Sequence, residues 1–248
     1  MKVLILLPSL DYDPTESAVP WKAMMRAGHS LTFSTPEGLP AYADQRLVDK
    51  GFSLLTPFLM TKNVDIAKYR EMITHESFLK PLAYAAVVAE EYDALFIPGG
   101  HAPGMKTMME SKAAQSICCY FMAENKPVAA VCHGVLLLAR SQYNNGESVL
   151  KGRHTTALTA SMELSAWVVT APWLGRYYRT YPMTVEQEVK QAVGKEGGFD
   201  KGPFLPIRDS ENNHRFGFTV LDKNYLSARW PGDCNKFSAD WVDVLGAG

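Results

Sequence analysis

Short, wholly apolar segments that stop abruptly at a turn place the strongest constraint on the fold of this chain. Val3–Leu7 ends at Pro8, Ala94–Ile97 ends at Pro98-Gly99-Gly100, and Val128–Val131 runs directly into Cys132. Strands with no polar face are typical of parallel sheets that are covered by helices on both sides. The sequence therefore predicts an α/β fold, with a doubly wound and mostly parallel sheet sandwiched by helices, as in flavodoxin-like folds.

Helical patterns alternate with these strands along the chain, and a β-hairpin follows near its end. Gly28 and Pro-Gly pairs mark several of the boundaries. We expect a single domain over residues 1–248, in which residues 40–80 and 170–215 are elaborations that form a small cap. The expected strands are Lys2–Leu7, Ser30–Ser34, Ala94–Ile97, Val128–Val131, Thr155–Thr159, and a hairpin of Arg215–Leu221 and Asn224–Trp230 around Asp222-Lys223. The expected helices are Glu16–Ala27, Ser111–Glu124, His133–Ser141, Met162–Val169, Thr184–Val193 and Asp233–Leu245.

Charge and composition exclude several classes of function. The net charge is −1, so the chain lacks the excess of basic residues that binding to nucleic acid or to an anionic membrane needs. Apolar stretches such as Pro127–Ala139 fall short of the roughly 18 residues of a membrane span, and the apolar run at the start is too short for a signal peptide. We therefore expect a cytoplasmic protein that binds neither nucleic acid nor membrane.

The four cysteines do not have the spacing of a structural cross-link or a metal site. Cys118 and Cys119 are adjacent, whereas Cys132 and Cys234 stand alone, so no CxxC pair exists. This pattern is typical of a reducing compartment and predicts no zinc site. We expect no metal and no organic cofactor. Cys118 and Cys119 are interpreted as packing or surface thiols, and Cys234 has only a weak case as a reactive one.

Cys132 stands at the junction between a buried strand and a helix, with Ala129, Ala130 and Gly134 as small neighbours. Tight strand-to-helix turns that present a nucleophile need small residues because backbone and side chains crowd there. The N-terminus of the following helix favours a thiolate. A buried cysteine that only fills space is the alternative, and we favour the nucleophile. His133 follows directly, although adjacency in sequence does not guarantee contact.

Two further strand ends are expected to meet Cys132, because parallel strands deliver their carboxyl ends to one crevice. Gly99 and Gly100 follow the strand Ala94–Ile97, and their N–H groups could serve as an oxyanion hole. Glu16 follows the first strand. Its carboxyl group either exchanges protons beside Cys132 or simply suits the first turn of a helix, and the residues alone leave both readings open.

Together these segments resemble the ThiJ/PfpI superfamily, which has the class I glutamine amidotransferase-like fold. The resemblance rests on Lys2–Pro8, Glu16, Asp93–Gly104, Val128–Gly134 and Thr219–Asp233. Within the superfamily the chain is most similar to the heat-shock chaperone and glyoxalase III branch, in which His follows the cysteine. The resemblance implies a homodimer. Ala228-Arg229-Trp230-Pro231 departs from the family pattern with a bulky pair of residues.

The resemblance also implies roles for individual residues. Cys132 is the expected nucleophile, Glu16 the acid and base beside it, and Gly100 and the N–H of His133 the oxyanion donors. Glu163, which follows a Thr-rich segment, inherits the role of orienting His133. Glutamine amidotransfer is disfavoured because no histidine has Glu two positions later.

The expected activity is conversion of a small 2-oxoaldehyde such as methylglyoxal to a 2-hydroxy acid through a hemithioacetal on the cysteine. One alternative is a cysteine-dependent hydrolase or peptidase of small amides. Another is a stress-response chaperone or redox sensor whose cysteine responds to peroxide.

Overall fold

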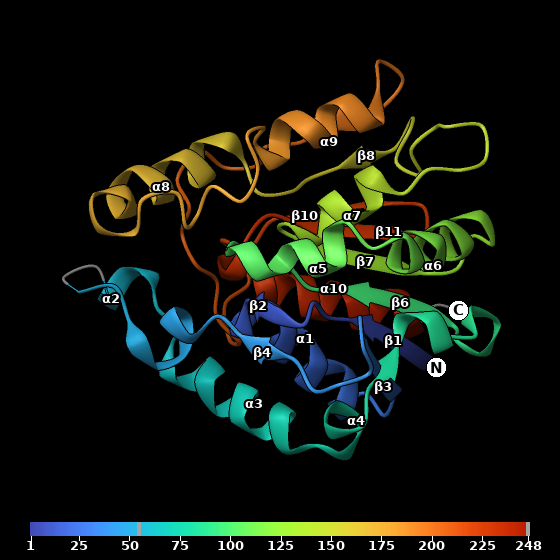
Figure 1. Ribbon diagram of the computed structural model, residues 1–248, viewed down its shortest axis with the longest axis horizontal. Coiled ribbons are helices and arrows are strands. Elements are labelled where there is room, and N and C mark those ends of the chain that lie inside the picture. The colour runs from blue at the N-terminus through green and yellow to red at the C-terminus, as the bar shows by residue number, and fades with distance from the viewer. Residues whose placement is uncertain (54–55, 247–248) are drawn as a thin grey trace.

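A seven-stranded sheet in the order β10-β11-β7-β6-β1-β3-β5 organises the computed structural model of the chain, which describes residues 1–53 and 56–246 (Figure 1). All neighbouring strands are parallel except β10 and β11, which form an antiparallel hairpin. The strands are β1 (Lys2–Leu6), β3 (Ser30–Thr35), β5 (Leu82–Ala83), β6 (Ala94–Ile97), β7 (Val128–Val131), β10 (Thr219–Asp222) and β11 (Tyr225–Ala228).

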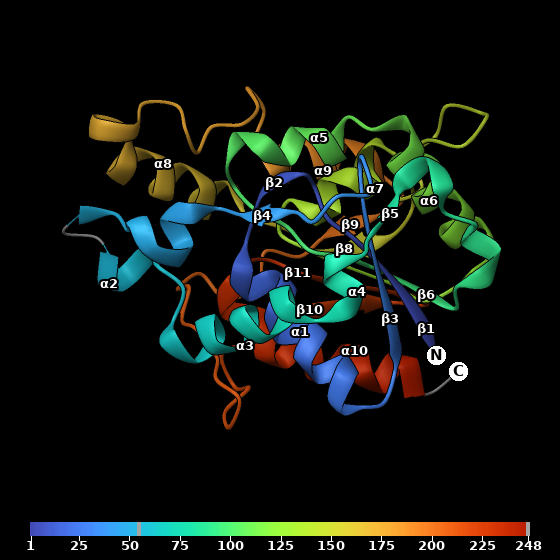
Figure 2. The same cartoon turned by 60° about the horizontal axis from the view of Figure 1, so that its bottom comes forward.

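Helices cover both faces of the sheet (Figure 2). One face carries α1 (Pro14–Arg26), α3 (Asn63–Thr74) and α10 (Cys234–Gly246), and the other carries α5 (Lys106–Met109), α6 (Lys112–Ala123), α7 (Gly134–Arg140) and α9 (Val185–Val193). This arrangement confirms the predicted fold class. Helix α8 (Ala160–Leu174) precedes α9 and extends past the sheet (Figure 1). The short elements are β2 (Leu10–Tyr12), β4 (Tyr42–Ala43), a π-helical turn (Arg46–Lys50), α2 (Thr56–Leu59), α4 (Glu76–Leu79), β8 (His154–Thr155) and β9 (Gly198–Phe199).

The central strands are buried on both faces, which explains their continuous apolar sequences. Every residue of β6 and β7 is inaccessible to solvent, and both strands have the bounds predicted from the sequence. Helices on each side of the sheet therefore supply the second and third layers of one continuous core.

Within the described ranges, no helix is both long and apolar enough to cross a bilayer.

Three predicted strands differ from those observed by more than one residue at an end. The two hairpin strands are shorter than Arg215–Leu221 and Asn224–Trp230, because they span only Thr219–Asp222 and Tyr225–Ala228. Thr155–Thr159 is not a strand of the main sheet. Only His154–Thr155 is extended, and it pairs with β9, because the Thr155 hydroxyl is bonded to Tyr225 and Ser227 at the sheet surface. The hairpin turn lies at Lys223-Asn224, one residue later than predicted, where Lys223 takes a φ of 57°. The predicted elaboration 40–80 holds β4, α2, α3 and α4, and its residues Leu54 and Leu55 lie outside the described ranges.

Candidate functional site

A cavity of about 440 Å³ opens where the chain leaves β1, β6 and β7. These strands are neighbours in the sheet, and β1 is the point from which the chain winds first to one side and then to the other. Ligands in open α/β sheets bind at such a point, beyond the carboxyl ends of the strands. Glu16 in the first turn of α1, Gly100 after β6 and Cys132 after β7 all line the cavity. The structure thus brings together three of the residues predicted from sequence.

Cys132 occupies a strained turn between β7 and α7. Its φ of 57° is in the left-handed region. Residues other than glycine rarely adopt this backbone conformation, and those that do are often found at functional sites. Its N–H donates to the carbonyl of Ala228 across the sheet at 3.1 Å. Two residues later, a Cβ on Gly134 would lie 2.4 Å from the carbonyl oxygen of Ile97. Glycine is therefore needed to let α7 pass so close to β6.

His133 contacts the sulfur of the preceding residue. Its Nδ1 lies 3.6 Å from Cys132 Sγ, and both side chains are almost wholly buried. Burial, the neighbouring His101 and the cation of Arg140 hold the pKa of His133 well below its ordinary value. The imidazole is therefore neutral, and in the tautomer that leaves Nδ1 unprotonated it can accept a proton from the thiol.

Glu16 is buried completely beside the same sulfur. A Cβ on Gly99 would lie 2.6 Å from Glu16 Oε2 and 2.8 Å from the Cβ of Cys132, so this glycine leaves just enough room for the carboxyl group. Neither carboxyl oxygen has a hydrogen-bond partner of good geometry among the described residues. Such a buried, unpaired carboxyl group is costly unless it is neutral.

Burial raises the pKa of Glu16 well above its ordinary value, and the charge of Asp13 raises it further, while the nearby Cys132 thiol and Gly99 N–H lower it by less. The pKa of Cys132 is also raised, by burial first and then by Glu16 and Asp13. The N–H of His133, next to the start of α7, lowers the pKa of Cys132 as the sequence predicts, but burial raises it by more. The expectation of a resting thiolate is therefore wrong. Because a negative charge on Glu16 or Cys132 raises the pKa of the other, the two groups are not both ionised at neutral pH.

The two predicted oxyanion glycines occupy different places. The carbonyl oxygen of Gly99 accepts a hydrogen bond from the N–H of Asp13, and the N–H of Gly99 faces the Glu16 carboxyl group. Gly100 lines the cavity, and a Cβ there would lie 2.5 Å from the carbonyl oxygen of Asp11. Gly99 thus supports Glu16, whereas Gly100 and the N–H of His133 remain as candidate donors to a substrate oxygen.

Glu163 does not contact His133, which corrects the role implied by the resemblance. Its Oε1 accepts from Arg179 at 2.7 Å, and its Oε2 accepts from the N–H of Val185, the first residue of α9, at 2.9 Å. Glu163 therefore joins α8 to α9 and neutralises Arg179. No carboxylate orients the imidazole of His133 through a hydrogen bond recorded for the described residues.

Other residues of the site were missed by the sequence reasoning. His101 lies between His133 and Tyr178, with ring centroids 5.0 and 5.1 Å away and the rings tilted, and burial lowers its pKa to about 4. Its position in the Pro-Gly-Gly-His run was the one available signal. Arg208 was also missed, because long-range contacts alone place it at the cavity. Trp230, one of the bulky pair noted in the sequence, lines the cavity beside it. Within the described ranges, no group of three or more His, Cys, Asp or Glu side chains is arranged to hold a metal ion.

Comparisons with known proteins find relatives that match about two thirds of this chain or less. A deglycase of Pyrococcus abyssi is 38% identical over 164 residues, covering 66% of this chain and 69% of that protein. A glutathione-independent glyoxalase of Schizosaccharomyces pombe is 26% identical over 152 residues, covering 60% of each chain. An uncharacterized protein of the same yeast is 30% identical over 142 residues, a match that spans only 50% of its length.

Solved structures share the fold. Glyoxalase III of Candida albicans superposes with a TM-score of 0.71 at 19% identity, covering 98% of this chain and 97% of that one. The family model described as ThiJ/PfpI family-like matches residues 7–201. Since that match spans more than half of the chain and includes Glu16, Gly100 and Cys132, which line the cavity, this chain belongs to the ThiJ/PfpI family.

Proposed function

We propose that the chain is a cysteine-dependent enzyme that converts 2-oxoaldehydes such as methylglyoxal to 2-hydroxy acids without glutathione. The observation that carries the proposal is the contact of Cys132 Sγ with a neutral His133 at 3.6 Å, beside a cavity that Cys132 and the buried Glu16 both line. The names of the yeast relative and the Candida structure, both glyoxalases, support the same class of reaction.

The first step is addition of Cys132 to the aldehyde. The thiol proton passes to Nδ1 of His133 as the S–C bond forms, and the Glu16 carboxyl group protonates the aldehyde oxygen. Gly100 and the N–H of His133 stabilise that oxygen as its charge develops. The result is a hemithioacetal, a Glu16 carboxylate and a protonated His133, so the site remains neutral overall.

Glu16 then transfers a proton between the two adjacent carbons. Its carboxylate removes the C–H proton of the hemithioacetal while His133 protonates the neighbouring carbonyl oxygen, which gives an enediol. Glu16 returns its proton to the second carbon, and His133 takes the proton of the first hydroxyl group, which leaves a thioester. Water hydrolyses the thioester, and the 2-hydroxy acid departs as the thiol is restored. The overall reaction consumes one water molecule and needs no oxidant.

The direct test is incubation of the purified protein with methylglyoxal, without glutathione, followed by an assay for lactate. We expect turnover by the natural chain, none by Cys132→Ala, and full turnover by Cys119→Ser, which alters a thiol on α6 away from the cavity. Lactate formation by Cys132→Ala would refute the proposal.

The same variants separate the alternatives. A cysteine-dependent hydrolase would release acid from small amides or peptides and leave methylglyoxal untouched. A holdase chaperone would suppress aggregation of a client equally well with Cys132→Ala. The hydrolase result would contradict aldehyde conversion at this site, whereas a holdase activity that survives Cys132→Ala would not depend on the site.

A further inference from the structure

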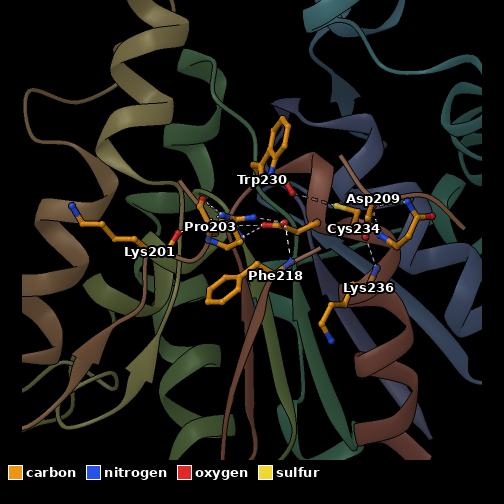
Figure 3. A network of polar contacts seen from close by, with 10 residues as sticks. Lys201, Pro203, Asp209, Phe218, Trp230, Cys234 and Lys236 are labelled. Atoms are coloured by element: carbon orange, nitrogen blue, oxygen red, sulfur yellow. Dashed lines mark hydrogen bonds and ion pairs between the residues drawn. The ribbon is translucent and has the colours of Figure 1, made fainter. Parts of the chain in front are cut away.

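One wall of the cavity is the segment Lys201–Asp209, which is fixed at both ends. The guanidinium group of Arg229 donates to the carbonyl oxygens of Lys201 at 3.4 Å and Pro203 at 3.0 Å, and it forms a fully buried ion pair with Asp233 (Figure 3). Arg229 belongs to the pair of residues that departs from the family pattern. In this chain it anchors the start of the wall.

The far end of the wall is held by Asp209. Its carboxylate accepts from Asn235 Nδ2 at 2.8 Å and from the N–H of Lys236 at 2.6 Å, in the first turn of α10. Its own N–H donates to the carbonyl oxygen of Gly232 at 2.8 Å. Figure 3 shows Asp209 at this end of the network, with Trp230 projecting to one side of it. Arg208, the residue before Asp209, is therefore tethered next to Trp230.

Arg208 and Trp230 present hydrogen-bond donors without acceptors. The guanidinium carbon of Arg208 lies 5.1 Å from the centroid of the Trp230 ring, and both residues line the cavity. Arg208 Nη1 and Trp230 Nε1 are shielded from solvent, and neither has a hydrogen-bond partner in the part of the chain that the structure describes. Leaving a charged donor in this state is costly, so a ligand that accepts from it gains correspondingly.

Asp13 acts on this cation through its charge, but no hydrogen bond joins it to Arg208 Nη1. The Oδ1 atom of Asp13 is already bonded to the N–H groups of Thr15 and Glu16. Glu16 is neutral for the reasons given above. Most of the remaining wall is apolar, with Phe52, Leu158, Met162, Val169, Leu205 and Pro231 among its residues. A low-dielectric wall strengthens the attraction between a guanidinium group and a bound anion.

We propose that Arg208, with Trp230, forms a carboxylate-binding subsite, and that the preferred substrate is an aldehyde with a carboxylate group beyond an apolar spacer. The planar guanidinium fork matches a carboxylate in two hydrogen bonds. The cavity of about 440 Å³ has room for such a molecule, whereas methylglyoxal, among the smallest 2-oxoaldehydes, has no group to reach the subsite. The inference rests on the proposed function and specifies its substrate class.

The test compares phenylglyoxal with its 3- and 4-carboxy derivatives as substrates. We expect the natural chain to prefer at least one carboxylated aldehyde by about tenfold or more in kcat/KM, since a hydrogen bond to a charged group contributes about 1.5–3 kcal/mol. Arg208→Gln should abolish that preference. Arg208→Lys should retain part of it, because the charge remains and the fork is lost.

The matched control is Arg215→Gln, which removes an exposed arginine beyond the wall and should leave the preference intact. Thermal unfolding of each variant verifies that it is folded. Equal kcat/KM values for the neutral and the carboxylated aldehydes in the natural chain would overturn the inference, and so would an unchanged preference in Arg208→Gln.

A binding measurement separates failure of this inference from failure of the proposed function. Calorimetry with 3-phenylpropanoate and its uncharged amide needs no turnover, because neither compound has an aldehyde. Tighter binding of the acid to the natural chain, lost in Arg208→Gln, supports the subsite even if no aldehyde is converted. Equal affinity for acid and amide contradicts the subsite even if methylglyoxal is converted.

Discussion

Nδ1 of His133 lies 3.6 Å from the sulfur of Cys132, the residue that precedes it in the chain. Neighbouring side chains normally diverge, but the positive φ of Cys132 turns the backbone sharply between them. The imidazole is neutral, and the thiol retains its proton at rest. Deprotonation of the sulfur is therefore expected to accompany attack on the substrate rather than to precede it.

Replacing Glu16 with Gln should reduce catalysis severely. The amide keeps the shape of the side chain but cannot carry a proton between carbons, and proton transfer by a positioned group contributes about 10²–10⁴ in rate. We expect kcat for 2-oxoaldehydes to fall by that factor, with no loss of thermal stability, because the buried carboxyl group forms no hydrogen bond of good geometry that an amide would break. A Glu16→Gln variant with unchanged kcat would contradict the proposed proton transfer.

Asp13→Asn should alter the pH dependence of stability. Burial, the largest influence, raises the pKa of Asp13 from 3.8 to about 6, so the unfolded chain ionises first as pH rises. The stability associated with Asp13 is fully present below about pH 4 and is lost as the pH approaches 6. Asn preserves the acceptor that caps α1. Urea unfolding at several pH values should show that the natural chain loses stability relative to Asp13→Asn between pH 4 and 6. A constant difference would refute this.

Glu163→Gln should destabilise the joint between α8 and α9 rather than impair the chemistry. The Glu163 and Arg179 side chains are 3% and 11% exposed, and breaking a buried ion pair typically costs about 3–5 kcal/mol. We expect a lower free energy of unfolding in urea, with kcat reduced by no more than a few-fold. Glu147→Gln, which breaks an exposed pair with Lys151, is the matched control. A large fall in kcat without loss of stability would restore the orienting role for Glu163.

Arg229→Met should loosen the cavity wall. Arg229 and Asp233 are both fully buried, so the variant leaves an unpaired carboxylate, at a cost of about 3–5 kcal/mol. Lys236→Met breaks a partly exposed pair with Asp240 and should cost less than about 1 kcal/mol. Hydrogen exchange should accelerate in residues 201–208 of Arg229→Met only. Equal exchange in the two variants would show that Arg229 does not anchor the wall.

The parts of the fold that were predicted are those determined by local pattern. Strands β6 and β7 have the expected bounds because an uninterrupted apolar run is compatible with burial on both faces. The segment after Thr155 was mistaken for a strand because β-branched residues favour extension, whereas hydroxyl contacts with Tyr225 and Ser227 decided its path. Local propensity yields to such tertiary contacts.

The site divides in the same way. Cys132, Gly100 and Glu16 follow buried strands, so strand order was enough to bring them together. The partner of Glu163 could not be read from spacing, because Arg179 comes from the turn after α8. Arg208 lies in a stretch with no periodicity, and Arg229 and Asp209 determine its place from distant parts of the sequence.

The wall and the nucleophile share one support. Arg229 follows the last residue of β11, Cys132 follows the last residue of the adjacent β7, and the N–H of Cys132 is bonded to the carbonyl oxygen of Ala228 between them. Any flexing of the sheet edge therefore carries both together and preserves the distance from sulfur to wall. Substitutions in residues 204–208 are consequently expected to change substrate specificity while the position of the reactive sulfur stays the same.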